Sequence, residues 1–190
     1  MKRFFLLPAM FLVFLTSCGG SDEHTEEITD NPIEELDYSD MNEMSLKEHG
    51  LNMSIMLPEV ASSTGASIEP KVEHDDGDYL WHIKIGTRFH LIIEDFGKEK
   101  NKVAGEKARL DDLNKIFVTE YLTDEPNFIM YKRTLHEDQG GKPSYHCYGE
   151  TTIDGYIYVL RSQEDGSLKP IIEDMMKTIK SAKPLTKEAV

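Results

Sequence analysis

The sequence predicts an α+β fold in which helices pack on an antiparallel β-sheet. Three observations support this class: apolar residues alternate along several short segments, tight turn signals join neighbouring segments, and two longer segments repeat apolar residues at helical spacing. The expected order is strand, hairpin, helix, strand, hairpin, helix, which suits one packed sheet. We expect a single domain over residues 46–183, behind a disordered N-terminal leash and ahead of a flexible tail at residues 184–190.

The first half of the domain is expected to form strands. Residues 51–58 alternate in hydropathy and stop at a proline, which indicates a strand. Residues 79–96 predict a long hairpin with a three-residue loop at 86–88, because a two-residue loop would scatter its apolar side chains over both faces. The expected register pairs Trp81 with Ile93, Ile83 with Leu91, and Ile85 with Phe89.

Helical spacing appears next in the middle of the chain. We expect a helix over residues 104–122, ended by Asp124-Glu125-Pro126. Its apolar stripe comprises Leu110, Leu113, Phe117 and Tyr121, with Ile116 beside it. A strand over residues 127–135 is expected to follow.

The last third of the domain is expected to form a second hairpin and a closing helix. Strands at residues 145–152 and 156–162 are joined through Ile153-Asp154-Gly155, and an Asp-Gly pair between such segments indicates a hairpin. The helix begins after Asp165-Gly166-Ser167. Its expected buried stripe comprises Leu168, Ile172, Met175, Ile179 and Ala182.

This order of elements resembles the Mog1/PsbP-like α/β/α sandwiches. The likeness rests on the opening strand that ends in Leu57-Pro58, the long central hairpin, the helix after it, and the closing strand pair with its amphipathic helix. It covers most of residues 50–182. The resemblance implies non-enzymatic accessory or binding roles, and it transfers no functional residue, because it is a likeness of element order without a shared motif.

The first residues are typical of a signal peptide. A cationic start precedes the apolar residues 4–15, a run shorter than the roughly 20 residues that a membrane span requires. Leu15-Thr16-Ser17-Cys18 then resembles the lipobox of bacterial lipoproteins. That resemblance implies removal of residues 1–17, lipid on the thiol of Cys18, and anchoring in the bacterial cell envelope. The alternative is an ordinary cleaved signal with a chance cysteine.

The segment that follows Cys18 is strongly acidic. The chain has 21 Lys and Arg against 35 Asp and Glu; without Lys2 and Arg3 the mature protein has 19 against 35, a net charge of −16. Residues 22–43 contain no Lys or Arg, so residues 18–45 are expected to form a flexible acidic linker. Such acidity argues against nucleic acid as a partner.

Residues after Cys18 also bear on location. Gly19 is not the aspartate that favours inner-membrane retention, and Ser21-Asp22-Glu23 resembles an acidic tag that directs some lipoproteins to the outer face. We expect the outer membrane. Whether the domain faces the periplasm or the cell surface stays open.

Motifs for covalent catalysis or cofactor binding are scarce. The chain has no Gly-x-Ser-x-Gly elbow, and His146 and Cys147 are adjacent on an expected strand, so their side chains point to opposite faces. Cys147 is expected to be a small buried core residue, and no cofactor is expected. The tyrosines of the closing hairpin either line a groove or pack on the sheet: Tyr145, Tyr148, Tyr156 and Tyr158.

A metal site can be drawn on the central hairpin. In the expected register His82, His90 and Glu94 share one face, and histidine and carboxylate are zinc ligands. The ammonium of Lys84, opposite His90, repels a cation, and ordinary strand histidines are the alternative. Three functions remain open, the third being an envelope spacer with no binding site. The first is a non-catalytic envelope lipoprotein that binds a protein partner or small ligand; the second is a metal-dependent hydrolytic enzyme using the His82/His90 face.

Overall fold

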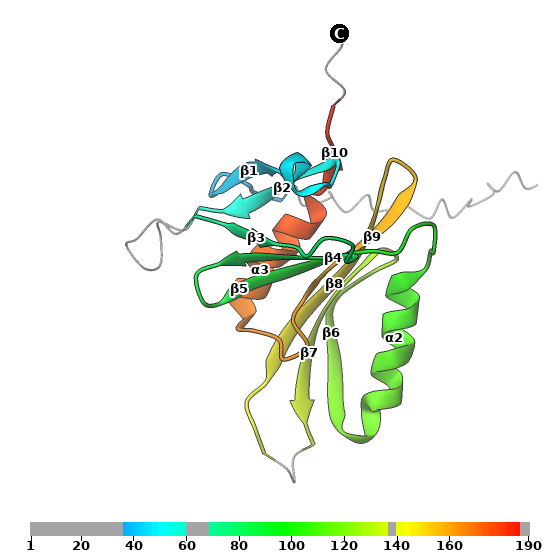
Figure 1. The fold of residues 1–190 in the computed structure, drawn as a ribbon. Helices are drawn as coiled ribbons and strands as arrows, with labels where there is room; N and C mark the ends of the chain where they lie inside the picture. Colours follow the sequence, from blue (N-terminus) through cyan, green and yellow to red (C-terminus); the bar gives the residue numbers. More distant parts are fainter. Residues whose placement is uncertain (1–35, 60–68, 137–139, 187–190) are drawn as a thin grey trace, which may run out of the picture. The chain divides into compact units, whose positions relative to one another are not determined.

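The computed structural model describes residues 36–59, 69–136 and 140–186. Within these ranges the main sheet has seven strands, all antiparallel, in the order β3-β4-β5-β9-β8-β7-β6 (Figure 1). The fold is therefore mixed α+β, as the sequence predicts. The strands are β3 (Lys71–Glu73), β4 (Leu80–Ile85), β5 (Phe89–Asp95), β6 (Phe117–Glu125), β7 (Phe128–Leu135), β8 (Ser144–Ile153) and β9 (Tyr156–Ser162).

A second, smaller sheet has the strand order β1-β2-β10. Its strands are β1 (Met41–Ser45), β2 (Met53–Pro58) and β10 (Lys183–Pro184). β1 pairs with β2 over its whole length, and the side chain of Met41 is buried. Between them, η1 (Lys47–His49) ends at Gly50, whose φ of 84° closes the turn.

These pairings correct both expected boundaries of the domain. Residues 36–45 belong to the fold, not to the linker at residues 18–45, because β1 buries Met41 and pairs with β2. Likewise the tail expected at residues 184–190 begins too early, since Pro184 pairs with Met53 and the Leu185 N–H donates to the Asn52 carbonyl. The signal peptide, Cys18 and the linker up to residue 35 lie outside the described residues, as do residues 187–190.

The two described helices lie on opposite faces of the main sheet. α3 (Lys169–Lys180) packs on β8 and β9 on one side and on β2 of the small sheet on the other. α2 (Lys102–Asp112) packs on β8 from the opposite face. No helix within the described ranges has the length and apolar character needed to cross a membrane.

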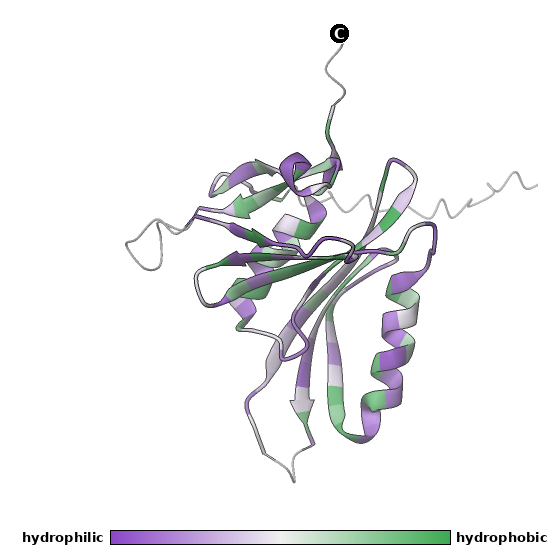
Figure 2. Cartoon of the chain, viewed as in Figure 1, coloured by the Kyte–Doolittle hydropathy of each residue, from purple (hydrophilic) through white to green (hydrophobic). Residues whose placement is uncertain are grey.

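Most of the apolar core lies on the α3 face. Buried side chains from both sheets and from α3 form one cluster there, with Ile83, Leu91, Met53, Ile55 and Ile172 almost fully enclosed. The α2 face holds a smaller cluster of Val103, Leu110, Ile129 and Tyr131. In Figure 2, α2 is largely hydrophilic, whereas β4 and β5 carry many hydrophobic residues.

The register predicted for the central hairpin is confirmed. Trp81 pairs with Ile93, Ile83 with Leu91, and Ile85 with Phe89, so the loop comprises residues 86–88. All six side chains are buried on the α3 face. The turn predicted at Asp154-Gly155 is also confirmed: both residues have positive φ, 52° and 83°, as a two-residue type I′ turn requires.

The helix predicted over residues 104–122 is wrong in its second half. α2 ends at Asp112, a short η2 (Leu113–Lys115) follows, and residues from Phe117 form β6, paired with β7. Val118, Thr119 and Thr123 favour a strand, and Phe117, Thr119 and Tyr121 face one side in alternation. The stripe predicted for the closing helix holds for Ile172, Met175 and Ile179, whereas Leu168 is exposed.

Candidate functional site

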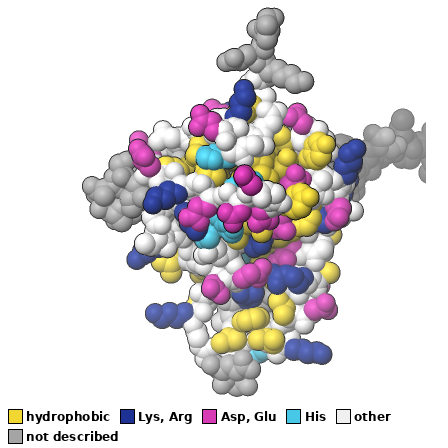
Figure 3. All heavy atoms as spheres, in the orientation of Figure 1, with side chains coloured by type: hydrophobic (Ala, Val, Ile, Leu, Met, Phe, Trp, Pro, Cys, Tyr) yellow, Lys and Arg dark blue, Asp and Glu magenta, His cyan; other side chains and the backbone are white. Residues whose placement is uncertain are grey.

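The part of the α2 face that α2 leaves uncovered carries the polar side chains of the sheet. Cross-strand rows run over it, and one row joins Ile92, Arg161 and Tyr148 from β5, β9 and β8. Figure 3 shows histidine side chains on the surface beside acidic and basic ones, over β3 and β4. Two hollows open on this face, one beside the histidines and one beside α2.

The structure brings the two predicted histidines together. His82 Nδ1 lies 2.9 Å from His90 Nε2, and His90 Nδ1 lies 2.5 Å from Gln163 Nε2. If Gln163 donates, His90 accepts at Nδ1 and donates from Nε2 to His82, which fixes both tautomers. Burial lowers the pKa of His90, and the neighbouring His82 lowers it further. Gln163, His90 and His82 are therefore joined in one chain of hydrogen bonds.

Glu94 is directed to another partner. Its Oε2 lies 3.6 Å from Arg161 Nε, and Lys84 Nζ pairs instead with Glu73 Oε2 at 2.5 Å. The hollow beside the histidines has a volume of about 480 Å³ and is lined on one side by Glu73, His74 and Asp78. In the described part of the chain, no group of three or more His, Cys, Asp and Glu side chains is arranged to hold a metal ion.

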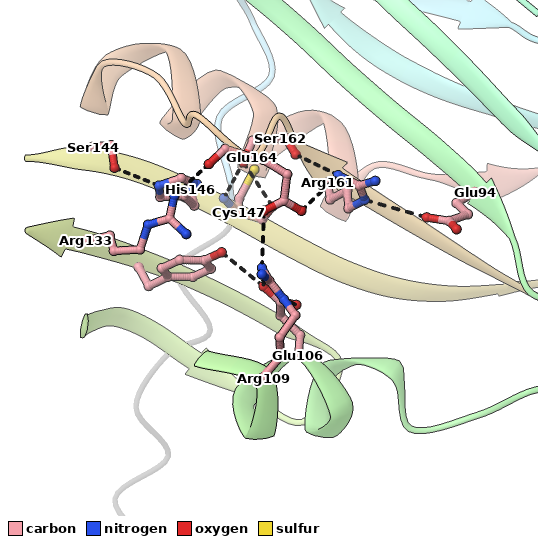
Figure 4. A network of polar contacts seen from close by, with 11 residues as sticks. Glu94, Glu106, Arg109, Arg133, Ser144, His146, Cys147, Arg161, Ser162 and Glu164 are labelled. Atoms are coloured by element: carbon pink, nitrogen blue, oxygen red, sulfur yellow. Dashed lines mark hydrogen bonds and ion pairs between the residues drawn. The ribbon is translucent and has the colours of Figure 1, made fainter. Parts of the chain in front are cut away.

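The second hollow is an arginine pocket between α2 and the loop after β9. It has a volume of about 160 Å³ and is lined by Glu106 and Arg109 of α2, Tyr131 of β7, His146 and Tyr148 of β8, Arg161 of β9, and Glu164 of the loop. Figure 4 shows Arg109 and Arg161 approaching the Glu164 carboxylate from two sides. These side chains come from four elements and a loop that lie far apart in the sequence, so the pocket forms only in the folded protein.

Glu106 and Arg109 form the α2 wall of this pocket. The guanidinium donates from Nε and Nη2 to the two Glu106 oxygens, both at 2.7 Å, and the Tyr131 hydroxyl donates to Glu106 Oε1 at 3.1 Å. The Glu106 side chain is only 7% exposed. A buried carboxylate requires such partners. Hydrogen bonding to Glu106 raises the pKa of Arg109, so the guanidinium stays charged.

Glu164 completes the pocket from the loop between β9 and α3. Its Oε2 lies 3.5 Å from Arg109 Nη2 and its Oε1 lies 3.7 Å from Arg161 Nη1. Charge-assisted N–H···O bonds are usually about 2.7–2.9 Å long. The carboxylate therefore bridges the two guanidiniums without a close hydrogen bond to either.

Arg133 of β7 holds the loop backbone. Its Nη2 donates to the Glu164 carbonyl at 2.7 Å, while its guanidinium lies over the Phe117 ring at 4.5 Å. On the other side of Glu164, Ser167 exchanges two backbone hydrogen bonds with Tyr145. Gly166 is required here, because a Cβ would lie 2.6 Å from the Tyr145 carbonyl and from the His146 ring. The backbone around Glu164 is thus fixed at both ends.

The neighbouring titratable groups are poor nucleophiles or bases. Burial raises the pKa of the Cys147 thiol to about 12. Burial, together with the charge of nearby Arg133, lowers the pKa of His146 to about 4. His146 stacks on Tyr131 at 4.9 Å and contacts the Ser144 hydroxyl at 2.8 Å. The prediction that Cys147 is a buried core residue is confirmed. The four tyrosines divide between faces: Tyr148 packs on the α2 side, Tyr145 and Tyr158 pack on the α3 side, and Tyr156 is exposed.

Sequence reasoning missed the arginine pocket. The one local signal was Glu106, which lies between Val103 and Leu110 on the apolar stripe of α2 at helical spacing. A carboxylate at such a position needs a buried partner, and Arg109 one turn away could have been assigned to it. Arg161 and Glu164 carry no such signal, because Arg161 pairs with Glu94 and Glu164 with Arg109, residues that lie far away in the sequence. Cys18, the predicted lipidation site, lies outside the described residues.

The chain matches no protein-family model and no curated protein.

Proposed function

We propose that this protein is a membrane-anchored lipoprotein of the bacterial cell envelope, attached through lipid on Cys18, and that its domain is a non-catalytic binding module. The anchor rests on the lipobox-like Leu15-Thr16-Ser17-Cys18 and on the cationic and apolar residues before it. We place the anchor in the outer membrane, from the residues that follow the cysteine. The module binds a protein partner of the envelope or a small ligand.

The arginine pocket is the observation that carries the binding role. It offers the guanidiniums of Arg109 and Arg161 in a small recess walled by tyrosine and buried carboxylate. Its volume of about 160 Å³ is below the roughly 300–1,000 Å³ of sites that enclose drug-sized ligands. It suits a small group or a single protruding side chain. Binding is favoured over catalysis, because burial moves the pKa values of Cys147 and His146 away from neutrality.

We also propose that the fold is of the Mog1/PsbP-like kind. An antiparallel sheet with α2 on one face and α3 on the other supports this, as does the order of elements along the chain. The small sheet β1-β2-β10 lies beyond α3, on the same side of the main sheet. The resemblance implies accessory or binding roles without catalysis, in agreement with the proposal.

The anchor is tested by replacing each cysteine in turn. We expect Cys18→Ala to abolish the lipid mass increment and to release the protein from the membrane fraction or leave it unprocessed. Cys147→Ala is the matched control, and it should retain both lipid and membrane attachment. Mass spectrometry and membrane fractionation provide the readouts. A Cys18→Ala protein that is cleaved normally and stays membrane-bound would contradict the anchor.

The binding role is tested by crosslinking in cells. Envelope proteins or small molecules recovered with the wild-type chain should be lost from Arg161→Met, which removes the guanidinium and keeps a long apolar side chain. Arg88→Met, in the exposed hairpin loop, is the matched control and should recover the same molecules. Equal recovery by both variants would exclude the arginine pocket as the binding site.

One observation favours the second candidate, a metal-dependent hydrolytic enzyme. His82 and His90 present two ring nitrogens 2.9 Å apart beside a hollow lined by Glu73 and Asp78. Zinc sites in enzymes usually have three protein ligands, so this candidate needs Glu73 to exchange Lys84 for a metal. Stoichiometric zinc in the purified protein, with a melting temperature that falls on chelation, would support it; absence of both effects would exclude it.

A further inference from the structure

Glu164 resembles a ligand bound in the arginine pocket. Its two carboxylate oxygens contact different guanidiniums: Oε2 lies near Arg109 and Oε1 lies near Arg161. Its side chain enters from the loop after β9, whereas Glu106, the other acidic residue that lines the pocket, belongs to α2 (Figure 4). We propose that the arginine pocket is a carboxylate-binding site, that Glu164 is its resident occupant, and that an incoming carboxylate displaces it. This inference rests on the binding role proposed above.

Arg161 has unused capacity to bind an anion. Its contacts to carboxylates are 3.6 Å to Glu94 and 3.7 Å to Glu164, and its contact to the Ser162 carbonyl is 3.5 Å. A guanidinium has five N–H donors, and its fork matches a carboxylate with two bonds at shorter range. The Arg161 side chain is 22% exposed and its acceptors lie 3.5 Å away or more, so its donors are available to an incoming anion.

Displacement of Glu164 requires movement of a side chain only. The Glu164 side chain is 63% exposed, and ion pairs of exposed groups contribute little stability. Its backbone is held independently, by Arg133 at the Glu164 carbonyl and by the two hydrogen bonds between Ser167 and Tyr145. Rotation of the side chain into solvent therefore empties the position between the guanidiniums while the loop keeps its place.

The charge of the pocket selects one negative group. With the Glu164 carboxylate removed, the pocket lining keeps the guanidiniums of Arg109 and Arg161 and the carboxylate of Glu106, which leaves one positive charge. His146 adds none at neutral pH, because burial lowers its pKa to about 4. The small volume excludes nucleotides and other large anions. A single carboxylate, from a free organic acid or from an acidic side chain of a partner, meets both conditions.

The test compares the purified wild-type protein with four variants by calorimetry and by NMR shift changes. The probes are acetate and succinate as free acids, a blocked glutamate peptide as a partner side chain, and inorganic phosphate. We expect Glu164→Gln, which keeps the shape and removes the charge, to bind the carboxylates at least tenfold more tightly than wild type. Glu173→Gln, an exposed glutamate on α3, is the matched control and should behave as wild type.

Arg161→Met in the Glu164→Gln background should remove the gain, and Arg161→Lys should remove most of it, since a lysine keeps the charge and loses the fork. If the methionine variant does not fold, the lysine variant alone tests the role of Arg161. Tighter binding of the peptide than of the free acids identifies a partner side chain as the source, and the reverse identifies a small acid. Either result supports the carboxylate site.

Equal carboxylate affinity of Glu164→Gln and wild type would overturn the inference, as would a gain that survives in both Arg161 variants. Tighter binding of phosphate than of any carboxylate would overturn the assignment of ligand class. These failures differ from failure of the binding role. If crosslinked molecules are lost with Arg161→Met while Glu164→Gln gains no affinity, the pocket still binds its partner and Glu164 is not a displaceable occupant.

Discussion

The two faces of the main sheet are built on different principles. The α3 face is apolar: side chains of two sheets and one helix pack there into a single cluster. Gly149 lies on this face and allows α3 to approach β8 closely. The α2 face has a small apolar cluster and, beside it, carboxylates, guanidiniums and histidines joined by hydrogen bonds. The same strands serve both, because alternate residues point to opposite faces.

This contrast separates stability from chemistry along single strands. On β8, Cys147 and Gly149 face the apolar core, while His146 and Tyr148 face the arginine pocket. Buried polar groups cost free energy unless they are paired, so the pocket depends on a core that is stabilised elsewhere. We therefore expect substitutions on the α3 face to affect folding most and those on the α2 face to affect pH dependence or binding.

The largest expected effect is loss of a core side chain on the α3 face. Ile172→Ala should lower the free energy of unfolding by about 3–5 kcal/mol, because α3 lies between two sheets and the cavity has little room to collapse. Leu110→Ala, the matched change on α2, should cost about 2–3 kcal/mol, since one side of α2 faces solvent. Urea unfolding measures both. Equal losses would remove the proposed difference between the faces.

His146 should give the α2 face an acid sensitivity. Its ordinary pKa is about 6.5, and burial lowers the pKa to about 4 in the folded protein. As the pH falls from 7 to 4, the unfolded chain therefore binds a proton that the folded protein excludes, and the free energy of unfolding falls by up to roughly 3 kcal/mol from this residue. His146→Asn should flatten that slope, as measured by urea unfolding at pH 7, 5.5 and 4. An unchanged slope in His146→Asn would show that other groups cause the loss.

A smaller effect is expected from filling the close contact between β8 and α3. A Cβ on Gly149 would lie 3.1 Å from Phe128 and collide with the Ile179 side chain. Gly149→Ala should therefore cost about 1–3 kcal/mol of stability. The double variant Gly149→Ala/Ile179→Ala should lose less stability than the sum of the losses in the two single variants. Full additivity, measured by the same unfolding experiment, would mean that Gly149 is not required for packing of α3.

The central hairpin could be predicted from the sequence because two local constraints agreed. The alternation from Trp81 to Ile93 set the faces, and only a three-residue loop kept all apolar side chains together. The segment after Asp112 satisfied two patterns at once. Phe117 and Tyr121 continue the helical stripe, yet they also alternate with Val118 and Glu120, and pairing with β7 decided for the strand.

The candidate site was less predictable for a physical reason. Apolar burial leaves periodic patterns, whereas a buried ion pair is built from residues that resemble surface residues in any window. Glu164 pairs with Arg109, 55 residues earlier in the chain, and Arg161 pairs with Glu94 of a neighbouring strand. His82 and His90 were found because both lie in one hairpin of known register.

The position of β1 has a mechanical consequence. The chain enters the described domain at Leu36 and runs directly into β1, in the small sheet beyond α3, on the other side of the main sheet from the arginine pocket. Tension applied through the N-terminal segment would load the pairing of β1 with β2 first. Strands β8 and β9, which hold His146 and Arg161, belong to a different sheet and share no hydrogen-bonded ladder with β1. Force applied to the chain would thus separate β1 from β2 while the arginine pocket keeps its geometry.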